Sequence, residues 1–421
     1  MAGERPRPHS DRSPRRRRAL CRPPAARVPH HPARPQPEPP SPLTPTAYGR
    51  WTSAHAVTPV ALRNHALPEH GAHSPPHHSP RHPLAPTRRP GPSDRRTMTV
   101  SNSVTPDIWP AAVPFPGSED PPGHVEDVNG VPARHHYVEA AGTSWHVVTA
   151  GDPDKPPLVF LHGFPESWWA FHAQIADLAA DAFCVAVDTL GNGQSDKRLD
   201  LDYHYGAVAA NIAALIDVCG LDRFALVAHD RGAVISDNLC AVPSMADRIV
   251  GYVRMQQSGN QPHSEPRPPH ELFASPAGVE LFKSGLLIDM AYGALPRPDG
   301  QPPLVARPLD DTTLARLRRE FSFPGVAEGA SASFRGASFD RELAERKARL
   351  FAAMTMPVLF LQGSRDPGQQ PSEYETVSDE VPDGRLVFVD AGHFFHLEAP
   401  AETNAEVRGF LTDIGWIGTQ A

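Results

Sequence analysis

The sequence predicts an α/β fold, in which a mostly parallel sheet of eight strands carries helices on both faces. Two observations predict it. Short β-rich runs alternate with segments of helical periodicity over most of residues 135–411, which is the pattern of strand–helix–strand units. In addition, residues 158–161 and 358–361 are apolar without interruption, as expected for parallel strands that are buried on both faces.

The eight strands are expected to follow one another with helices between them. We place them near residues 135–140, 144–150, 157–161, 182–188, 224–229, 249–255, 357–361 and 385–389. The helices are clearest where apolar residues recur at helical spacing. These segments are 207–218 and, as a closing helix, 401–411.

An insertion interrupts this alternation between the sixth and seventh predicted strands. Residues 257–349 are rich in Pro and Gly, and helical segments are expected near 277–291, 312–321 and 340–353. Because open α/β sheets bind ligands beyond the carboxyl ends of their strands, we expect the insertion to fold over those ends as a cap. Residues 106–256 and 350–421 would then form the core.

The composition changes sharply near residue 100. Residues 1–100 hold 22 of the 50 prolines, 17 arginines and 5 acidic residues, so their formal charge is +17 − 5 = +12. With so few apolar side chains, this stretch cannot bury enough surface to offset the entropy of ordering. We therefore expect residues 1–105 to be a disordered extension. Met98 is the first methionine after Met1, and it is a candidate for the true start of the protein.

The bulk properties bear on several classes of function. The arginines at 15–18 leave nucleic-acid contact, an organelle transit peptide or an export signal open for the extension. The rest of the chain carries −8 − 12 = −20, which argues against a nucleic-acid surface there. No apolar stretch reaches the ~18 residues that a membrane span requires. Cys184, Cys219 and Cys240 lack the spacing of a metal site and are expected to be buried thiols.

These properties give the expected setting of the protein. We expect it to be cytoplasmic, without a metal or cofactor, and without a nucleic-acid or membrane partner. Its expected partners are a small-molecule substrate and water. The oligomeric state stays open.

The strongest chemical motif follows the predicted strand at 224–229. The residues read FALVAHDRGA, so the strand leads to Asp230, and a helix is expected directly after it. A strand-to-helix turn this sharp needs small residues two positions before and after its apex, and Ala228 and Gly232 meet this need. Asp230 would then be held clear of the sheet. An isolated Asp could instead cap the helix, so the other motifs decide.

A second motif, HGFPESWW at 162–169, follows the predicted strand at 157–161. With the AHDRG turn, it resembles the epoxide hydrolases and dehalogenases of the α/β-hydrolase family. This resemblance implies an α/β-hydrolase fold with Asp230 as nucleophile. It also implies an oxyanion hole built from the backbone N–H groups of Phe164 and Arg231. Trp168 of the same motif is expected to contact the substrate.

Two late residues complete the resemblance. Asp366 lies in QGSRDP and His393 in DAGHFF, each after a predicted strand, and nucleophile, acid and histidine follow one another in the order of this fold. The neighbouring Asp390 and His396 are weaker candidates. The loop at 188–197 resembles the family's D-x-x-G-x-G-x-S-D loop, for which a structural role is expected.

A carboxylate nucleophile suits attack on a saturated carbon. A serine would form an ether there, which water does not readily cleave, whereas Asp230 would form an ester. An Asp is ionised at neutral pH and needs no base for this first step. His393 would then remove a proton from water, while Asp366 orients the imidazole and stabilises its charged form.

The cap residues bear on the substrate. The resemblance to epoxide hydrolases implies two cap tyrosines that protonate the opening oxygen, but residues 257–349 contain only Tyr292. Phe334 stands where the second tyrosine is expected, and its ring donates no proton. Tyr292 alone, or a histidine such as His263 or His270, could serve as the acid. We therefore expect Tyr292 and Phe334 to contact the substrate.

Alternatives to an epoxide hydrolase remain. Haloalkane dehalogenases carry a tryptophan directly after the nucleophile, where this chain has Arg231. Fluoroacetate dehalogenases have arginine there, but they add a second one where this chain has Val234, so a bidentate carboxylate clamp would be incomplete. A serine esterase is disfavoured because no G-x-S-x-G occurs. A non-catalytic binding protein of the same fold would be expected to lose a member of the triad, and all three are present.

Overall fold

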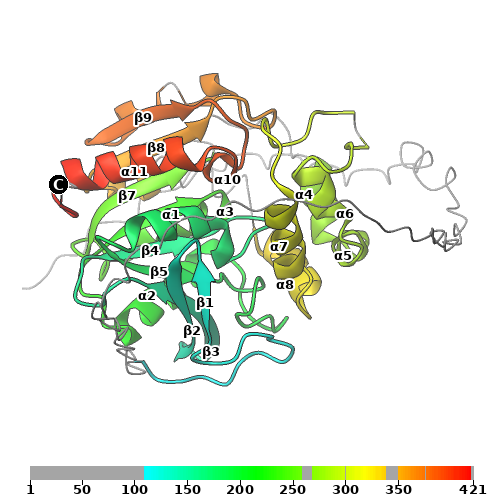
Figure 1. Cartoon of the computed structure of the whole chain (residues 1–421), viewed down its shortest axis with the longest axis horizontal. Helices are drawn as coiled ribbons and strands as arrows, with labels where there is room; N and C mark the ends of the chain where they lie inside the picture. The colour runs from blue at the N-terminus through cyan, green and yellow to red at the C-terminus, as the bar shows by residue number, and fades with distance from the viewer. Residues whose placement is uncertain (1–108, 258–267, 299, 338–348, 375, 419–421) are drawn as a thin grey trace, which may run out of the picture. The chain divides into compact units, whose positions relative to one another are not determined.

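The computed structural model describes residues 109–257, 268–298, 300–337, 349–374 and 376–418 (Figure 1). The predicted extension at 1–105 lies outside the described residues, as does most of the helical segment expected at 340–353. The domain boundaries drawn from the sequence therefore remain predictions.

The described residues form one nine-stranded sheet in the order β1-β2-β3-β5-β4-β6-β7-β8-β9. Its strands are β1 (Val125–Val128), β2 (Val131–Ala140), β3 (Thr143–Ala150), β4 (Pro157–Leu161), β5 (Phe183–Val187), β6 (Phe224–His229), β7 (Ile249–Met255), β8 (Val358–Gly363) and β9 (Gly384–Val389). In this spatial order, the neighbouring strands β1, β2, β3 and β5 pair antiparallel. From β5 through β4 to β9, the neighbouring strands pair parallel. The mostly parallel sheet is thus confirmed.

The prediction of eight strands is wrong by one, because β1 was missed. β1 has the sequence VEDV, and Val128 is its one buried residue. It pairs with β2 at the edge of the sheet, with Val125 opposite Arg134. A four-residue edge strand with two acidic residues has neither the apolar run nor the clear alternation that predicts a strand. Its pairing with β2 defines it.

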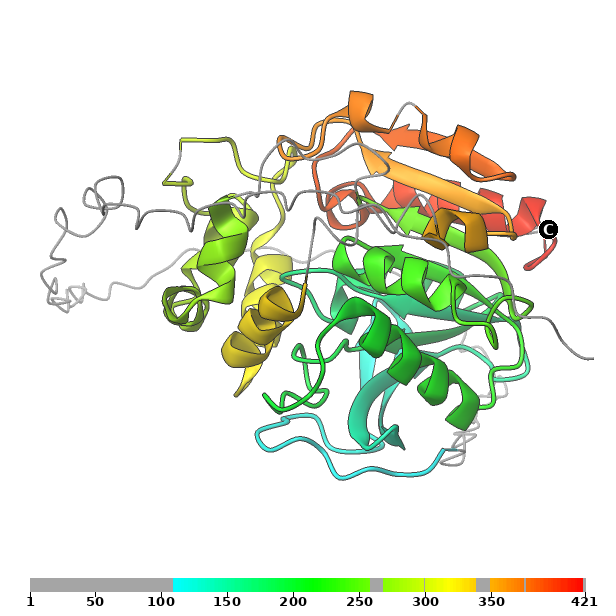
Figure 2. The same cartoon turned by 180° about the vertical axis from the view of Figure 1, so that it is seen from behind.

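Helices cover both faces of the sheet, as predicted. α1 (His172–Leu178) and α11 (Pro400–Asp413) lie on the face turned to the viewer in Figure 1, and α2 (Tyr205–Val218) and α3 (Arg231–Cys240) on the face seen in Figure 2. The strands supply both layers of core by alternation. In β4, Leu158 and Phe160 join the cluster under α1 and α11, whereas Val159 and Leu161 join the cluster under α2 and α3.

Five α-helices lie between β7 and β8 in the described part of the chain, at the site of the predicted cap. They are α4 (Pro268–Ala274), α5 (Pro276–Lys283), α6 (Leu286–Ala291), α7 (Asp311–Phe321) and α8 (Val326–Gly336). The segment expected at 277–291 is two helices, because Gly285 between them takes a left-handed φ of 74°. α4 and α8 were not predicted. The sequence of α8, VAEGASASFRG, has a low intrinsic helix propensity, so packing against the other cap helices stabilises it.

Short helices complete the chain. They are the 3₁₀ turns Trp168–Phe171, Phe351–Ala353, Pro371–Glu373 and Val377–Glu380, and the single helical turn α10 (Phe395–Glu398). Among the described residues, no helix is both long and apolar enough to cross a membrane. Cys184, Cys219 and Cys240 are buried free thiols, as predicted.

Ion pairs attach the cap helix α7 to the N-terminal strands. Arg316 binds Glu126 of β1 through two hydrogen bonds of 2.8 and 3.0 Å. Arg319 contacts Asp120, in the segment before β1, at 3.1 and 3.2 Å. The Arg316–Glu126 pair is bidentate, and such pairs fix orientation as well as distance. β1 therefore has a role that its sequence alone did not indicate, since it holds the cap.

Candidate active site

The turn between β6 and α3 places Asp230 at the carboxyl end of the sheet. Asp230 has φ 48° and ψ −117°, a conformation that costs a non-glycine residue on the order of 1–3 kcal/mol. The turn is tight on both sides. A Cβ atom on Gly163 would lie 2.5 Å from Cβ of Asp230, and one on Gly232 would collide with the carbonyl of Leu161. Close contact therefore requires glycine at 232, as expected, and also at 163 in the neighbouring loop.

The structure brings Asp230, His393 and Asp366 together. Asp366 follows β8, and its Oδ2 lies 2.7 Å from Nδ1 of His393, which follows β9. Nε2 of His393 lies 3.8 Å from Oδ2 of Asp230. Three segments that are far apart in the sequence thus converge at one edge of the sheet. One ring nitrogen of His393 is bound to the acid, and the other faces the predicted nucleophile.

The predicted oxyanion residues flank Asp230. The N–H of Phe164 donates to Oδ1 of Asp230 at 3.1 Å. Arg231 begins α3 directly after Asp230, and the role of its N–H stays a prediction. Its side chain is engaged elsewhere, because the guanidinium donates to the hydroxyl of Tyr205 at 2.6 Å and to the carbonyl of Ser333 at 3.0 Å. Arg231 therefore links the core to cap helix α8.

The charges of the site favour a protonated histidine beside two carboxylates. Burial would lower the pKa of His393, but the anions of Asp366 and Asp230 outweigh it and raise that pKa to about 9. Burial would raise the pKa of Asp366, but the charge and hydrogen bond of His393 lower it, aided by the N–H groups of Gly368 and Gln256. The opposite shifts are those of a coupled ion pair.

A model of the alpha/beta hydrolase fold matches residues 156–400, which is more than half of the chain. This chain belongs to the α/β-hydrolase fold family. The match begins just before β4 and ends at α11, so it includes all three residues of the predicted triad.

This α/β-hydrolase is similar to proteins named as epoxide hydrolases. Epoxide hydrolase B of Mycobacterium tuberculosis is 26% identical over 350 residues, which cover 66% of this chain and 98% of that protein. Epoxide hydrolase 1 of Caenorhabditis elegans is 32% identical over 116 residues, which cover 27% of this chain and 29% of that protein. The solved structure of Cfl2 wild-type from Burkholderia cenocepacia is 26% identical and has a TM-score of 0.56, covering 69% of this chain and 99% of that one. The predicted fold and family resemblance are confirmed, and the relatives support a hydrolase.

The cap of this α/β-hydrolase places Tyr292 and Phe334 near the elbow. Tyr292 is buried, its ring lies 4.4 Å from that of Phe394, and its hydroxyl donates to the carbonyl of Pro165 at 3.5 Å. Burial, with the charges of Glu166 and Asp230, raises the pKa of Tyr292 well above its usual value. A phenol in this environment keeps its proton at neutral pH.

Phe334 belongs to an aromatic cluster over the oxyanion loop. Its ring lies 4.8 Å from that of Phe164 and 5.4 Å from that of His270. The guanidinium of Arg231 lies 3.9 Å from its centre. His263, the other histidine considered as an acid, lies outside the described residues. Phe334 therefore packs against the oxyanion loop in an aromatic and cationic environment, and its contact with a substrate stays a prediction.

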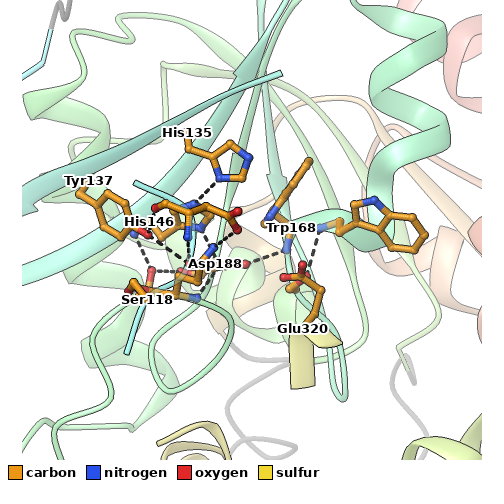
Figure 3. A network of polar contacts seen from close by, with 12 residues as sticks. Ser118, His135, Tyr137, His146, Trp168, Asp188 and Glu320 are labelled. Carbon is orange, nitrogen blue, oxygen red and sulfur yellow. Dashed lines mark hydrogen bonds and ion pairs between the residues drawn. The ribbon is translucent and has the colours of Figure 1, made fainter. Parts of the chain in front are cut away.

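Trp168 does not join this group, and the prediction that it contacts the substrate is not supported by its position. Its side chain is fully buried in the core cluster under α1 and α11. Its backbone N–H donates to Asp188 at 2.8 Å, and its ring packs edge-on against His135 (Figure 3). Trp169, the next residue of the motif HGFPESWW, is less buried and packs against the hydrophobic cluster of the cap helices. Trp168 therefore anchors the loop to the hydrophobic core.

A second histidine–carboxylate group, which the sequence did not predict, lies under the elbow. Glu166 contacts Nδ1 of His229 at 2.8 Å and Nε2 of His396 at 2.9 Å, and it accepts the N–H of Gly163 at 2.7 Å. Nε2 of His229 donates to the carbonyl of His393 at 3.0 Å. Glu166 therefore ties the oxyanion loop to the segment that carries the predicted base. Glu166 lies in the motif HGFPESWW and His229 in AHDRG, but only the tertiary structure pairs them.

The same three side chains are the one group in the described residues with ligand atoms close enough to hold a metal, all within 4.8 Å of one another. Two of their contacts, at 2.8 and 2.9 Å, are hydrogen-bond distances. The oxygen of Glu166 that contacts His229 also accepts the N–H of Gly163, and the other ring nitrogen of His229 donates to the carbonyl of His393. The arrangement is that of a buried hydrogen-bond network.

Proposed function

We propose that this α/β-hydrolase opens a small epoxide by forming an ester with Asp230, and that water then hydrolyses the ester. The observation that carries the proposal is the carboxylate at the elbow, with a donor N–H on one oxygen and a histidine facing the other. The similarity to epoxide hydrolases over nearly the whole of a relative supports the substrate class.

In the first step, an oxygen of Asp230 forms a bond to an epoxide carbon, and the bond from that carbon to the epoxide oxygen breaks. The alkoxide that leaves must gain a proton. We assign this proton to Tyr292, a buried phenol that keeps its proton at neutral pH. His393 is not needed in this step, because Asp230 attacks as an anion.

In the second step, His393 removes a proton from water, and the resulting hydroxide adds to the carbonyl carbon of the ester. The N–H of Phe164 donates to the oxyanion that forms there. The intermediate then collapses, and the bond from the carbonyl carbon to the substrate oxygen breaks. That oxygen takes the proton held by His393 and the diol leaves, while the second proton of the water passes to the phenolate of Tyr292 and the carboxylate of Asp230 is restored. Formation of the ester also removes the charge of Asp230, which is one of the charges that raise the pKa of His393. Loss of that charge lowers the pKa of His393, so that, after release of a proton to solvent, more of the imidazole is in the neutral form that can accept a proton from water, and this orders the two steps.

A single turnover in H₂¹⁸O tests the proposal. With enzyme in excess over an epoxide such as styrene oxide, the diol of the first turnover should contain only ¹⁶O, since its new oxygen comes from Asp230. The peptide that contains Asp230 should gain ¹⁸O. A diol that carries ¹⁸O in the first turnover would show that water attacks the epoxide directly, and it would refute the ester.

A haloacid dehalogenase is the second candidate, and the position of Arg231 favours it. A guanidinium directly after the nucleophile could bind the carboxylate of a halogenated acid. Its contacts with Tyr205 and Ser333 already occupy part of its donor set. Release of halide from fluoroacetate or chloroacetate, with no turnover of epoxides, would select this function. A binding protein without catalysis would give neither product nor an adduct.

A further inference from the structure

Gln256 directly follows β7 at the edge of the sheet that carries the triad. It is fully buried and has a φ of 41°. A left-handed conformation is uncommon for a residue other than glycine, and it persists where surrounding contacts determine it. Its backbone N–H donates to the carbonyl of Leu361 at 3.1 Å, and its side chain makes two further hydrogen bonds. A strained glutamine at this place therefore has a defined orientation.

The orientation of its amide follows from its partners. The N–H of Gly363 can only donate, so the atom 2.6 Å from it is the carbonyl Oε1 of Gln256. The amide Nε2 consequently faces the other way, where it donates to Oδ2 of Asp366 at 2.8 Å. Gln256 thus bridges the last residue of β8 and the carboxylate that follows three residues later.

The oxygen that Gln256 contacts is the one that holds the predicted base. Oδ2 of Asp366 accepts from Nδ1 of His393 at 2.7 Å and from Gln256 at 2.8 Å, while Oδ1 accepts the N–H of Gly368 at 2.7 Å. Two donors on one oxygen, and a third on the other, fix the plane of the carboxylate. A second donor on Oδ2 also disperses the negative charge that attracts the proton of His393.

We propose that Gln256 is a positioning residue that orients Asp366 toward His393 and sets the pH at which His393 becomes a base. The inference rests on the proposed function, because it concerns the hydrolysis of the ester on Asp230. Gln256 acts through Asp366 and contacts no reacting atom. The other charged groups that influence His393 are Asp230 and Glu166, and neither is bound by the side-chain amide of Gln256.

Two variants of Gln256 change the donor in different ways. Gln256→Met removes the N–H, so Asp366 should hold the proton of His393 more tightly. The pH at which ester hydrolysis reaches half its maximum should rise by about one unit, since a hydrogen bond to a charged group is of that size. Gln256→Glu places a second carboxylate beside Asp366, so its rise should be larger. The maximal rate in Gln256→Met should fall on the order of tenfold.

Gln362 offers a matched control. It is a buried glutamine on β8, next to Gly363, and its side-chain nitrogen and oxygen have no hydrogen-bond partner in the described structure. Gln362→Met makes the same glutamine-to-methionine change on the neighbouring strand. It removes no hydrogen bond to Asp366. Its pH profile should match that of the parent protein.

The measurement is the rate of ester breakdown against pH, followed by rapid mixing with an epoxide, with folding checked by circular dichroism. A half-maximal pH that stays unchanged or falls in Gln256→Met, or that moves equally in Gln362→Met, overturns the inference. Gln256→Glu keeps the shape of the side chain and replaces Gln256→Met in this test if the latter does not fold. A half-maximal pH that stays unchanged or falls in Gln256→Glu then overturns the inference. Absence of an ester in the parent protein would instead refute the proposed function, so the two failures are distinguishable.

Discussion

His393 and His396 lie three residues apart, are both buried and each contact a carboxylate, yet their electrostatic environments are opposite. His393 faces Asp366 and Asp230, and these anions raise its pKa to about 9. Burial and, next, the neighbouring His229, with which it shares Glu166, together lower the pKa of His396 to about 4. A carboxylate contact alone therefore does not make a histidine a base.

The two histidines also differ in the environment of their second ring nitrogen. Nε2 of His393 faces Asp230 across 3.8 Å, a distance that is too long for a hydrogen bond. His396 has Nε2 bound to Glu166 and Nδ1 buried. The Glu166 group holds the oxyanion loop and the carbonyl of His393 in place, and the Asp366 group presents an imidazole to the site. We expect substitutions in the two groups to affect different properties.

The largest difference should come from the histidine variants. His393→Ala should lower turnover by on the order of 10⁴-fold or more. Because Asp230 needs no base to attack, the variant should still form the ester and then stall. Mass spectrometry after exposure to an epoxide should show one added substrate mass on the peptide that contains Asp230. Asp230→Ala should show neither adduct nor turnover.

The control for that experiment is His396→Gln, which keeps a donor N–H for Glu166. It should retain turnover within about tenfold of the parent and accumulate no ester. Full turnover in His393→Ala, or an adduct on a serine, would mean that the base or the nucleophile is wrongly assigned.

Substitutions of Asp366 and Glu166 should likewise affect different properties, namely turnover and stability. Asp366→Asn should lower turnover by on the order of 10⁴-fold, because the imidazole loses its orienting anion, while the protein stays folded. Glu166→Gln removes a buried anion that contacts two histidines and the N–H of Gly163. Because it weakens the buried hydrogen bonds to a charged group, it should reduce the free energy of unfolding by about 1–3 kcal/mol. Urea unfolding and steady-state kinetics on both variants measure this, and equal stability losses would contradict the division of roles.

The pH dependence of stability should separate the histidines by sign. His396 has a folded pKa of about 4, below the ~6.5 of an unfolded histidine, so stability should be lost as pH falls from about 6.5 toward 4. His393 has a folded pKa of about 9, so its contribution is complete below about pH 6.5 and is lost as pH rises through 9. Each histidine can contribute a slope of up to about 1.4 kcal/mol per pH unit. His396→Gln should flatten the acid slope and His393→Gln the alkaline one, as measured by urea unfolding across pH; slopes that do not change would contradict the shifts.

The comparison also shows which parts of the site the sequence could predict. Asp230, Asp366 and His393 each follow an apolar strand, and the ends of parallel strands meet at one edge, so local motifs located all three. Glu166 and His396 are separated by 230 residues, and only the fold pairs them. Gln256 was missed for the same reason, since its role depends on Gly363 and Asp366. In the cap, α8 was missed because glycine and serine weaken its helical signal, while Trp168 was misplaced because a motif does not say which way a side chain points.

The smallest predicted effect concerns the cap, where Phe334 stands in place of an expected tyrosine. Its ring lies 4.8 Å from that of Phe164, whose N–H contacts Asp230, so we expect a hydroxyl on this ring to reach the site. A general acid contributes about 10²–10⁴-fold when it is the sole proton source, but Tyr292 already serves in the proposed mechanism. Burying a hydroxyl also costs about 1–3 kcal/mol until it finds a partner. The net gain in epoxide turnover from Phe334→Tyr should therefore be modest, about tenfold, and it should appear in kcat more than in KM.

Phe282→Tyr is the matched control, because Phe282 is a buried ring of the same cluster, 5.4 Å from Phe164, and it should give no gain. If Phe334→Tyr also gives none, and the parent protein releases halide from a fluoro- or chloro-acid, the geometry serves a dehalogenase, and Arg231 rather than a tyrosine pair determines the substrate.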